Sequence, residues 1–168
     1  MKEPVLVILK PDAIAKGLVG DVLVRFAEID LEILGMRVCI PTKKLAEEHY
    51  QNIQGQKFFK GTVEFFMGKF NKQNKVIAIV YYGKQAITKC RKLIGATNPE
   101  EAHPTSLRGM YGRVTTKGIY ENVVHASSSS KDAKREIKLW FGPDMISKRT
   151  LFPTKKITLA KQTVRVWA

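Results

Sequence analysis

The sequence is poor in cysteine and in long apolar runs, and each shortage excludes a class of protein. It has two cysteines and no CxxC pair, so we expect buried free thiols in a reducing compartment rather than a disulfide framework. The first apolar run covers only residues 5–9, which is too short for the core of a signal peptide or for a membrane span. We therefore expect a cytoplasmic protein without a membrane span.

Acidic residues are also scarce, with 15 Asp and Glu against 29 Lys and Arg. The formal net charge of +14 suits polyanionic partners, which include nucleotides, nucleic acid and acidic membrane surfaces, and does not choose among them. A length of 168 residues with 44% hydrophobic residues fits one folded domain with a proper core.

Two common nucleotide-binding signatures are missing as well, since the chain has no GxxxxGK[ST] and no GxGxxG. If this protein handles nucleotides, cationic side chains must hold the phosphates. The candidates are Lys10, directly after a predicted strand, Arg91, near the end of a predicted helix, and Arg108, in a glycine-flanked loop. Taken singly, each is more often a solvated surface charge.

The order of the predicted elements is strand, helix, strand, strand, helix, strand, with short helices inserted. This order indicates an α+β, ferredoxin-like βαββαβ fold with a four-stranded antiparallel sheet and helices packed on it. Helices on one face would leave the other face to be covered, for which an oligomer is one solution. The predicted strands are residues 5–9, 31–40 (interrupted at Gly35), 76–82 and 122–124, and the predicted helices are residues 19–29, 84–94 and one that begins at Thr42.

The other segments are interpreted by their composition. Residues 68–75 are polar and basic and look like an exposed hairpin connection, and residues 106–121 carry too many glycines and tyrosines for a long regular element. We divide the chain into a domain of residues 1–141 and a basic extension of residues 142–168. The extension has enough apolar residues to pack on the domain or on a neighbouring subunit.

The stretch 122–141 carries the clearest chemistry. A short apolar strand leads to His125, four serines follow, and a helical pattern begins where Ser129 and Asp132 give a weak capping signal. A helix N-terminus favours anions, so a neutral imidazole beside it suggests a nucleophile that takes up a phosphoryl group. The plainer alternative is a histidine on the surface or one that is merely hydrogen-bonded.

Several motifs in a fixed order give a specific resemblance. LAEEHY at 45–50, GATNPEEA at 95–102 and NVVHAS at 122–127, preceded by KPDA at 10–13, resemble nucleoside diphosphate kinase, and the likeness runs from about residue 3 to residue 141. The resemblance implies transfer of the γ-phosphate of a nucleoside triphosphate to a nucleoside diphosphate by a ping-pong mechanism through a phosphohistidine. It also implies ATP and other nucleoside tri- and diphosphates as partners, Mg²⁺ as cofactor and a homo-oligomer, either hexamer or tetramer.

The resemblance further implies roles for single residues. His125 resembles the nucleophile, which Ser127 and Glu136 orient. Tyr50 matches a residue near the phosphates and Phe58 the aromatic on which the base stacks. Magnesium bridges phosphate oxygens in this family, so we assign no protein metal ligand. The residues that match phosphate and sugar contacts are Lys10, Arg91, Thr97, Arg108 and Asn122.

The chain also departs from the family pattern. Ser128 and Met110 replace aspartates, and Thr62 replaces an apolar base contact. The segments 68–75 and 112–121 are longer than usual. These departures and the basic charge leave an alternative open, in which a catalytically weak family member acts as a nucleic-acid-binding or scaffold protein. A weaker alternative is association with anionic membrane surfaces through the basic extension.

Overall fold

Our computed structural model of the protein describes residues 1–116, 118–148 and 150–155. Its centre is a four-stranded sheet in the order β2-β3-β1-β6, in which every neighbouring pair is antiparallel. This order confirms the predicted ferredoxin-like α+β plan. The strands are β1 (Lys2–Leu9), β2 (Glu32–Cys39), β3 (Val76–Lys84) and β6 (Val124–Ala126).

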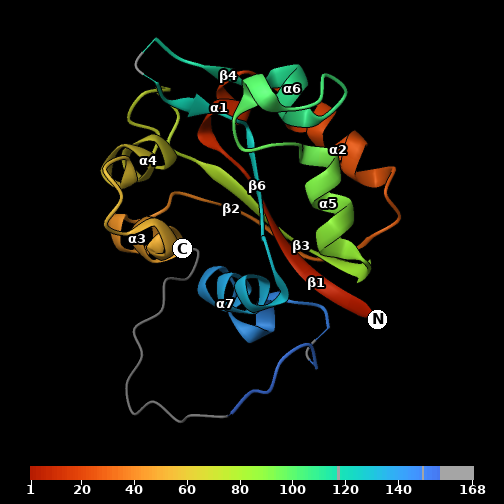
Figure 1. The fold of residues 1–168 in the computed structure, drawn as a ribbon. Coiled ribbons are helices and arrows are strands. Elements are labelled where there is room, and N and C mark those ends of the chain that lie inside the picture. The colour runs from red at the N-terminus through yellow and green to blue at the C-terminus, as the bar shows by residue number, and fades with distance from the viewer. Residues whose placement is uncertain (117, 149, 156–168) are drawn as a thin grey trace, which may run out of the picture.

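Helices cover both faces of this sheet, so the expectation that one face stays open is wrong. The unbroken apolar run from Val5 to Leu9 explains the arrangement, because side chains on both faces of β1 are fully buried. The helices form two groups, one on each side of the sheet (Figure 1). The first group is α2 (Val19–Ala27) and α5 (Ala86–Ile94), and the second is α3 (Lys43–His49), α4 (Phe59–Phe66) and α7 (Ser130–Trp140).

The predicted interruption at Gly35 is present as a bulge in β2, between Ile33 and Gly35. A Cβ at Gly35 would lie 2.7 Å from the carbonyl oxygen of Met145, so glycine allows the chain after α7 to approach the sheet closely. Ser147 donates its amide to the carbonyl of Leu34 (2.8 Å). The first part of the predicted extension therefore packs along β2, whereas residues 156–168 lie outside the described residues.

Two of the less regular segments differ from their predictions. Residues 68–75 form no hairpin, because they join α4 to β3. The helix α4 itself is missing from the sequence prediction, since its Phe-rich sequence with Gly61 gives weak helix propensity and α4 is stabilised by burying Val63 and Phe66 in the core. The cap at Thr42 is confirmed by a hydrogen bond from the Leu45 amide to its hydroxyl (3.2 Å).

The described residues between 106 and 121 form only short elements, as expected. A five-residue helix, α6, leads into a two-stranded antiparallel ribbon. None of the helices in the described part of the chain has the length and hydropathy needed to cross a membrane. The remaining short elements are α1 (Pro11–Ala15), α6 (Leu107–Tyr111), β4 (Arg113–Val114), β5 (Tyr120–Glu121) and the 3₁₀ turns η1 (Gln51–Ile53), η2 (Pro99–Glu101) and η3 (Pro143–Met145).

Candidate active site

His125 lies in the middle of a strand, and not after one as predicted. The strand β6 is Val124–Ala126, and His125 pairs with Ile8 of the central strand β1. Its side chain is 20% exposed. The nucleophile candidate is therefore fixed through its backbone to the fully buried part of β1.

A tight turn at Val123 explains the shift of the strand. Val123 has a φ of 52°, and the amide of Val124 bonds to the carbonyl of Asn122 (2.6 Å). This backbone conformation is strained for a β-branched residue, so the surroundings must hold it. The buried carboxylate of Asp12 accepts the Val123 amide (2.9 Å), and the Lys10 amide donates to the Val123 carbonyl (2.8 Å).

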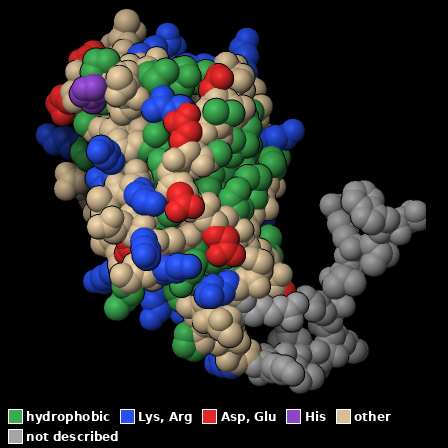
Figure 2. All heavy atoms as spheres, turned by 90° about the vertical axis from the view of Figure 1, so that its right-hand side faces the viewer, with side chains coloured by type: hydrophobic (Ala, Val, Ile, Leu, Met, Phe, Trp, Pro, Cys, Tyr) green, Lys and Arg blue, Asp and Glu red, His purple; other side chains and the backbone are tan. Residues whose placement is uncertain are grey.

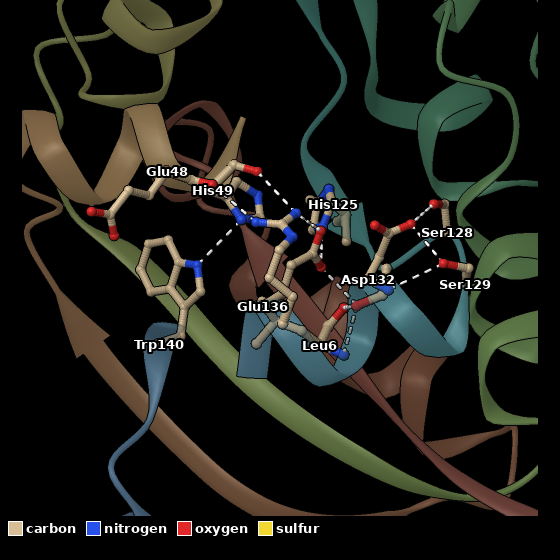
Figure 3. Close-up of polar contacts among 12 residues, drawn as sticks. Leu6, Glu48, His49, His125, Ser128, Ser129, Asp132, Glu136 and Trp140 are labelled. Carbon is tan, nitrogen blue, oxygen red and sulfur yellow. Dashed lines mark hydrogen bonds and ion pairs between the residues drawn. The ribbon is translucent and has the colours of Figure 1, made fainter. Parts of the chain in front are cut away.

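Glu136 of α7 is the main partner of the His125 ring. Nε2 of His125 lies 3.0 Å from Oε2 of Glu136, and Ser127 Oγ donates to the same oxygen at 2.7 Å (Figure 3). The other carboxylate oxygen accepts from Arg135 at 3.3 Å. A carboxylate at Nε2 holds the proton of a neutral ring there, so the lone pair lies at Nδ1.

The start of α7 lies beside this group. The Asp132 amide bonds to Ser129 Oγ (3.1 Å), which confirms the predicted cap. The hydroxyls of Ser128 and Ser129 both donate to the Asp132 carboxylate, and these bonds lower its pKa (Figure 3). The sequence predicted that the N-terminus of α7 could bind an external anion. In the structure, the carboxylate of Asp132 already lies at this terminus.

An aromatic cluster lies behind His125. The rings of His49 and His125 have centroids 4.5 Å apart and cross at 78°. His49 is 2% exposed, and its burial, with the charges of His125, Lys10 and Arg135, lowers its pKa well below the ordinary value. The indole Nε1 of Trp140 donates to Nδ1 of His49 at 3.3 Å.

On the other side of the site, one polar chain joins three distant segments. The amine of Lys10 donates to Oδ1 of Asn122 (2.6 Å), and the Asn122 amide donates to the Thr97 carbonyl (2.8 Å). Lys10 is 7% exposed. Burial lowers the pKa of Lys10 to about 8, the charge of Arg108 acts in the same direction, and Asp12 opposes them.

A second buried cation, Arg108, stands next to this chain. Its guanidinium donates to the Val124 carbonyl through Nε (3.2 Å) and Nη2 (2.8 Å), and to the Gly95 carbonyl through Nη1 (3.1 Å). These bonds leave part of the guanidinium fork available to a ligand. Burial lowers the pKa of Arg108 to about 10, and the charge of Arg91, which is exposed on α5, adds to the effect.

The other predicted site residues differ in how closely they approach His125 and its neighbours. Tyr50 packs its ring against His49 (4.7 Å between centroids), and burial raises its pKa above the usual range. Thr97 is exposed and reaches the site through its backbone. Phe58 is 59% exposed and makes no ring contact with the other predicted site residues in the described part of the chain.

The sequence prediction gave no role to several residues that complete the site. Asp12 and His49 stood in the motifs KPDA and LAEEHY, so their positions were visible but their contacts were not. Arg135 and Trp140 gave no signal, because a charged helix face and an apolar helix position are common in any helix. Arg135 also donates to the carbonyl of Glu48 (2.9 Å), which ties α7 to α3.

Comparison with known proteins agrees with this geometry. The family model described as nucleoside diphosphate kinase matches residues 3–146. The chain belongs to the nucleoside diphosphate kinase family. It is therefore a nucleotide-binding phosphotransferase that passes a phosphoryl group from a nucleoside triphosphate to a nucleoside diphosphate.

Relatives of this kinase family come from all domains of life. The chain is 40% identical to the nucleoside diphosphate kinase of Pyrococcus furiosus over 144 residues, which cover 86% of each chain. It is 37% identical to a nucleoside diphosphate kinase of Dictyostelium discoideum named as cytosolic, over 85% of this chain and 86% of the relative. A solved structure of the Borrelia burgdorferi enzyme, a transition-state mimic with vanadate and ADP, matches with a TM-score of 0.76 and 32% identity, over 92% of this chain and 93% of that one.

The family assignment favours a kinase over the alternative, a nucleic-acid-binding or scaffold protein. On the face drawn in Figure 2, lysines and arginines are spread out and acidic side chains lie among them. Nucleic acid is usually bound by clustered basic residues that track a phosphate backbone. The high net charge is therefore not by itself a sign of such a surface.

Proposed function

We propose that this kinase works by a ping-pong mechanism in which Nδ1 of His125 carries the phosphoryl group. The contact between Glu136 and Nε2 of His125 carries the proposal, because it leaves Nδ1 as the unprotonated nitrogen. The Nδ1 lone pair forms a bond to the γ-phosphorus while the bond to the β-phosphate oxygen breaks and the diphosphate leaves. A terminal β-phosphate oxygen of the second nucleotide then attacks the phosphohistidine, and the N–P electron pair returns to Nδ1.

Ser127 and Glu136 act as orienting groups in this mechanism. Their hydrogen bond of 2.7 Å is buried, and Ser127 also accepts the amide of Leu6 (3.1 Å), so the carboxylate is tied to the central strand. As the imidazole gains positive character during attack, the carboxylate at Nε2 stabilises it.

The phosphates are held by the cations on the opposite side of the site. Phosphoryl transfer spreads negative charge over the transferring oxygens, and fixed cations stabilise it without moving. Lys10 and Arg108 are the buried donors, and the exposed Arg91 adds positive charge that acts on Arg108. Thr97, Asn122 and Tyr50 complete the phosphate and sugar contacts.

Phe58 provides the surface for the base. Its ring is more than half exposed at the start of α4, so a base can stack on it from solvent. Stacking on an aromatic face depends little on base identity. The Thr62 hydroxyl donates its proton to the Phe58 carbonyl (3.0 Å), so it can only accept a hydrogen bond from a base. A broad range of nucleotides is therefore expected.

Magnesium is the metal that we assign to the reaction, bound through the nucleotide. Glu136 bonds to His125, Ser127 and Arg135. Asp12 accepts the Val123 amide through Oδ2, and its Oδ1, which has no partner among the described residues, is buried with a side chain only 1% exposed. This donor set fits a metal held by phosphate oxygens and water. When bound, the ion neutralises charge on the transferring phosphates.

A homo-oligomer, hexamer or tetramer, is supported by the edge strand of the sheet. β2 lies at one edge, and large apolar side chains on and beside it are exposed. An exposed apolar edge of this kind favours association with a second copy. A mass measurement in solution tests the proposal, and a monomer at micromolar concentration would contradict it. The residues concerned are Ile33, Met36, Val38 and Ile40, each 46–60% exposed.

We also propose a cytoplasmic location, supported by the cytosolic relative from Dictyostelium and by the free thiols of Cys39 and Cys90. We keep the division into a domain of residues 1–141 and an extension from residue 142. Ile146, which is 6% exposed, supports packing of the extension on the domain.

Incubation with γ-labelled ATP and magnesium tests the mechanism. The wild-type protein should form an acid-labile, base-stable phosphoprotein that is discharged by added nucleoside diphosphate. His125→Ala should abolish the signal. His103→Ala, at an exposed histidine between η2 and α6, should leave it intact. An undiminished signal in His125→Ala, or no phosphoprotein in the wild type, would contradict the mechanism.

A further inference from the structure

The Glu136 contact leaves one motion of the His125 ring weakly restrained. The last side-chain torsion of histidine is broad, because it joins a tetrahedral carbon to a planar ring. In an imidazole, Nε2 lies nearer to the rotation axis than Nδ1 does. A bond at Nε2, such as the 3.0 Å contact with Glu136, therefore fixes the tautomer better than it fixes the plane of the ring. Rotation about that axis would swing Nδ1 away from an in-line attack.

A perpendicular ring is the contact that restrains such a rotation, and His49 supplies one. The two imidazoles cross at 78° with centroids 4.5 Å apart (Figure 3). His49 is itself enclosed, with Tyr50 at 4.7 Å and 75° and with Phe66 stacked at 5.4 Å and 19°. A close-packed ring on rigid neighbours cannot give way when His125 turns.

Trp140 fixes the orientation of His49 in turn. An indole N–H can only donate, so the 3.3 Å bond from Trp140 makes Nδ1 of His49 the acceptor and places the proton of the neutral ring on Nε2. That Nε2 is buried and has no hydrogen-bond partner among the described residues. Burying such a donor costs free energy that a phenylalanine in the same slot would avoid.

The same bonds argue against a metal at this cluster. Ring nitrogens of His49 and His125 and a carboxylate oxygen of Glu136 lie within 4.8 Å of one another, which is the donor set of a transition-metal site. A metal at Nε2 of His49 would require the proton on Nδ1, where it would oppose the Trp140 N–H. A metal at Nε2 of His125 would displace the Glu136 contact. The cluster is thus arranged to hold rings in place.

We propose that His49 is a positioning residue for phosphoryl transfer, whose ring holds the plane of the His125 imidazole while Trp140 holds His49. The proposal rests on phosphorylation of His125 as described above. His49 acts through the orientation of Nδ1 and not through contact with the nucleotide. It should therefore affect the rate of the chemical step and leave nucleotide binding unchanged.

Two variants of similar volume separate the planar ring from simple filling of space. His49→Phe keeps a flat ring in the slot, and His49→Leu fills the slot without one, while both lose the Trp140 bond. Rapid quenching with labelled ATP measures the single-turnover rate of His125 phosphorylation, and equilibrium titration measures the Kd of the nucleotide. We expect His49→Leu to slow phosphorylation about tenfold to 100-fold with Kd within about twofold, because a small misplacement of a reacting atom has effects of this size.

His49→Phe should recover the rate to within about threefold of the wild type. Equal slowing in both variants, or a wild-type rate in His49→Leu, would overturn the proposal. If the leucine variant does not fold, Trp140→Phe decides. This variant removes the bond to His49 and also part of the ring that packs against His49 at 5.7 Å, whereas His49→Phe keeps the whole Trp140 ring. We therefore expect Trp140→Phe to slow phosphorylation about threefold or more at unchanged Kd, and a wild-type rate would contradict the proposal. Failure of the ping-pong mechanism is distinguishable, because the wild type would then form no phosphoprotein at all.

Discussion

The two sides of the active site differ in their electrostatic state before any nucleotide binds. On the histidine side, the buried carboxylate of Glu136 is matched by Ser127, His125 and Arg135. On the phosphate side, Lys10 and Arg108 are buried beside each other, and burial lowers the pKa of both. The carboxylate of Glu136 is thus matched without a ligand, whereas the phosphate side has an excess of positive charge that an anion would relieve.

This difference separates two tasks. The histidine side sets the geometry of the nucleophile, so its residues should control the rate of chemistry. The phosphate side binds the charge of the substrate and of the transition state, so its residues should control both affinity and rate. The predictions below test whether the two sides divide the work in this way.

The largest effect is expected at Lys10. Lys10→Met keeps the length of the side chain and removes the charge, and kcat/KM should fall about 100- to 1,000-fold, as for loss of one fixed donor to a transition state. The melting temperature without nucleotide should not fall, because a desolvated cation has been removed. Steady-state kinetics and thermal melting check both results. Lys92→Met, at an exposed lysine of α5, is the control and should change neither. A drop in melting temperature with little loss of activity would reverse the comparison.

The next effect is expected at Glu136, on the histidine side. Glu136→Gln keeps the size of the side chain but weakens the anchor at Nε2 and leaves Arg135 without its partner. We expect kcat to fall about 10- to 100-fold, because Glu136 orients the reactive ring without touching the nucleotide, while the KM of the nucleotide stays within about twofold. Glu100→Gln, at an exposed residue of η2, serves as the control. A large rise in KM with kcat preserved would mean that the two sides are not separate.

A smaller effect should follow from pH. The pKa of Lys10 is lowered to about 8, so the nucleotide-free site loses this cation as the pH rises through 8. Nucleotide affinity at pH 9 should therefore be about tenfold weaker than at pH 7. The free energy of unfolding should change in the opposite direction, and increase with pH. Between pH 8 and the unfolded value near 10.5 the unfolded chain binds more protons, so the Lys10 contribution to the free energy of unfolding increases.

Calorimetric titration across this pH range measures the affinity. Lys10→Arg keeps its charge to a higher pH, so its affinity should change less over the same range. A flat profile for the wild type, or an equal slope in the arginine variant, would show that Lys10 is not the titrating group.

The smallest effect is expected at Phe58, an exposed residue on which we expect the base to stack. Phe58→Ala removes a stacking surface, and KM should rise about five- to tenfold with similar factors for purine and pyrimidine substrates. The value of kcat should change little, because Phe58 makes no contact with His125 or Glu136 among the described hydrogen bonds and ring pairs. Phe70→Ala, at another partly exposed phenylalanine outside the site, is the matched control. A strong preference for one base in the variant would contradict tolerant stacking.

Local patterns in the sequence were enough for much of the fold. The element order predicted the sheet and the fold class. The apolar run predicted β1, and the caps at Thr42 and Ser129 predicted where two helices begin. They did so because alternation, helical spacing and capping depend on residues a few positions apart. They failed at α4, where burial overrides weak helix propensity, and at Val123, where a strained turn shifts β6 by two residues.

The sequence by itself also determined which residue types the chemistry uses, since the ordered motifs named His125, Glu136, Lys10 and Arg108. Only the tertiary structure decided how they meet. Ser127 bonds to Leu6 and Lys10 to Asn122 across more than one hundred residues of chain, because β1 pairs with β6 in one register. The roles of His49 and Trp140 belong to this second class. Whether a buried ring or amine is a core residue or part of the machinery depends on the groups that packing places beside it, and no local pattern contains that information.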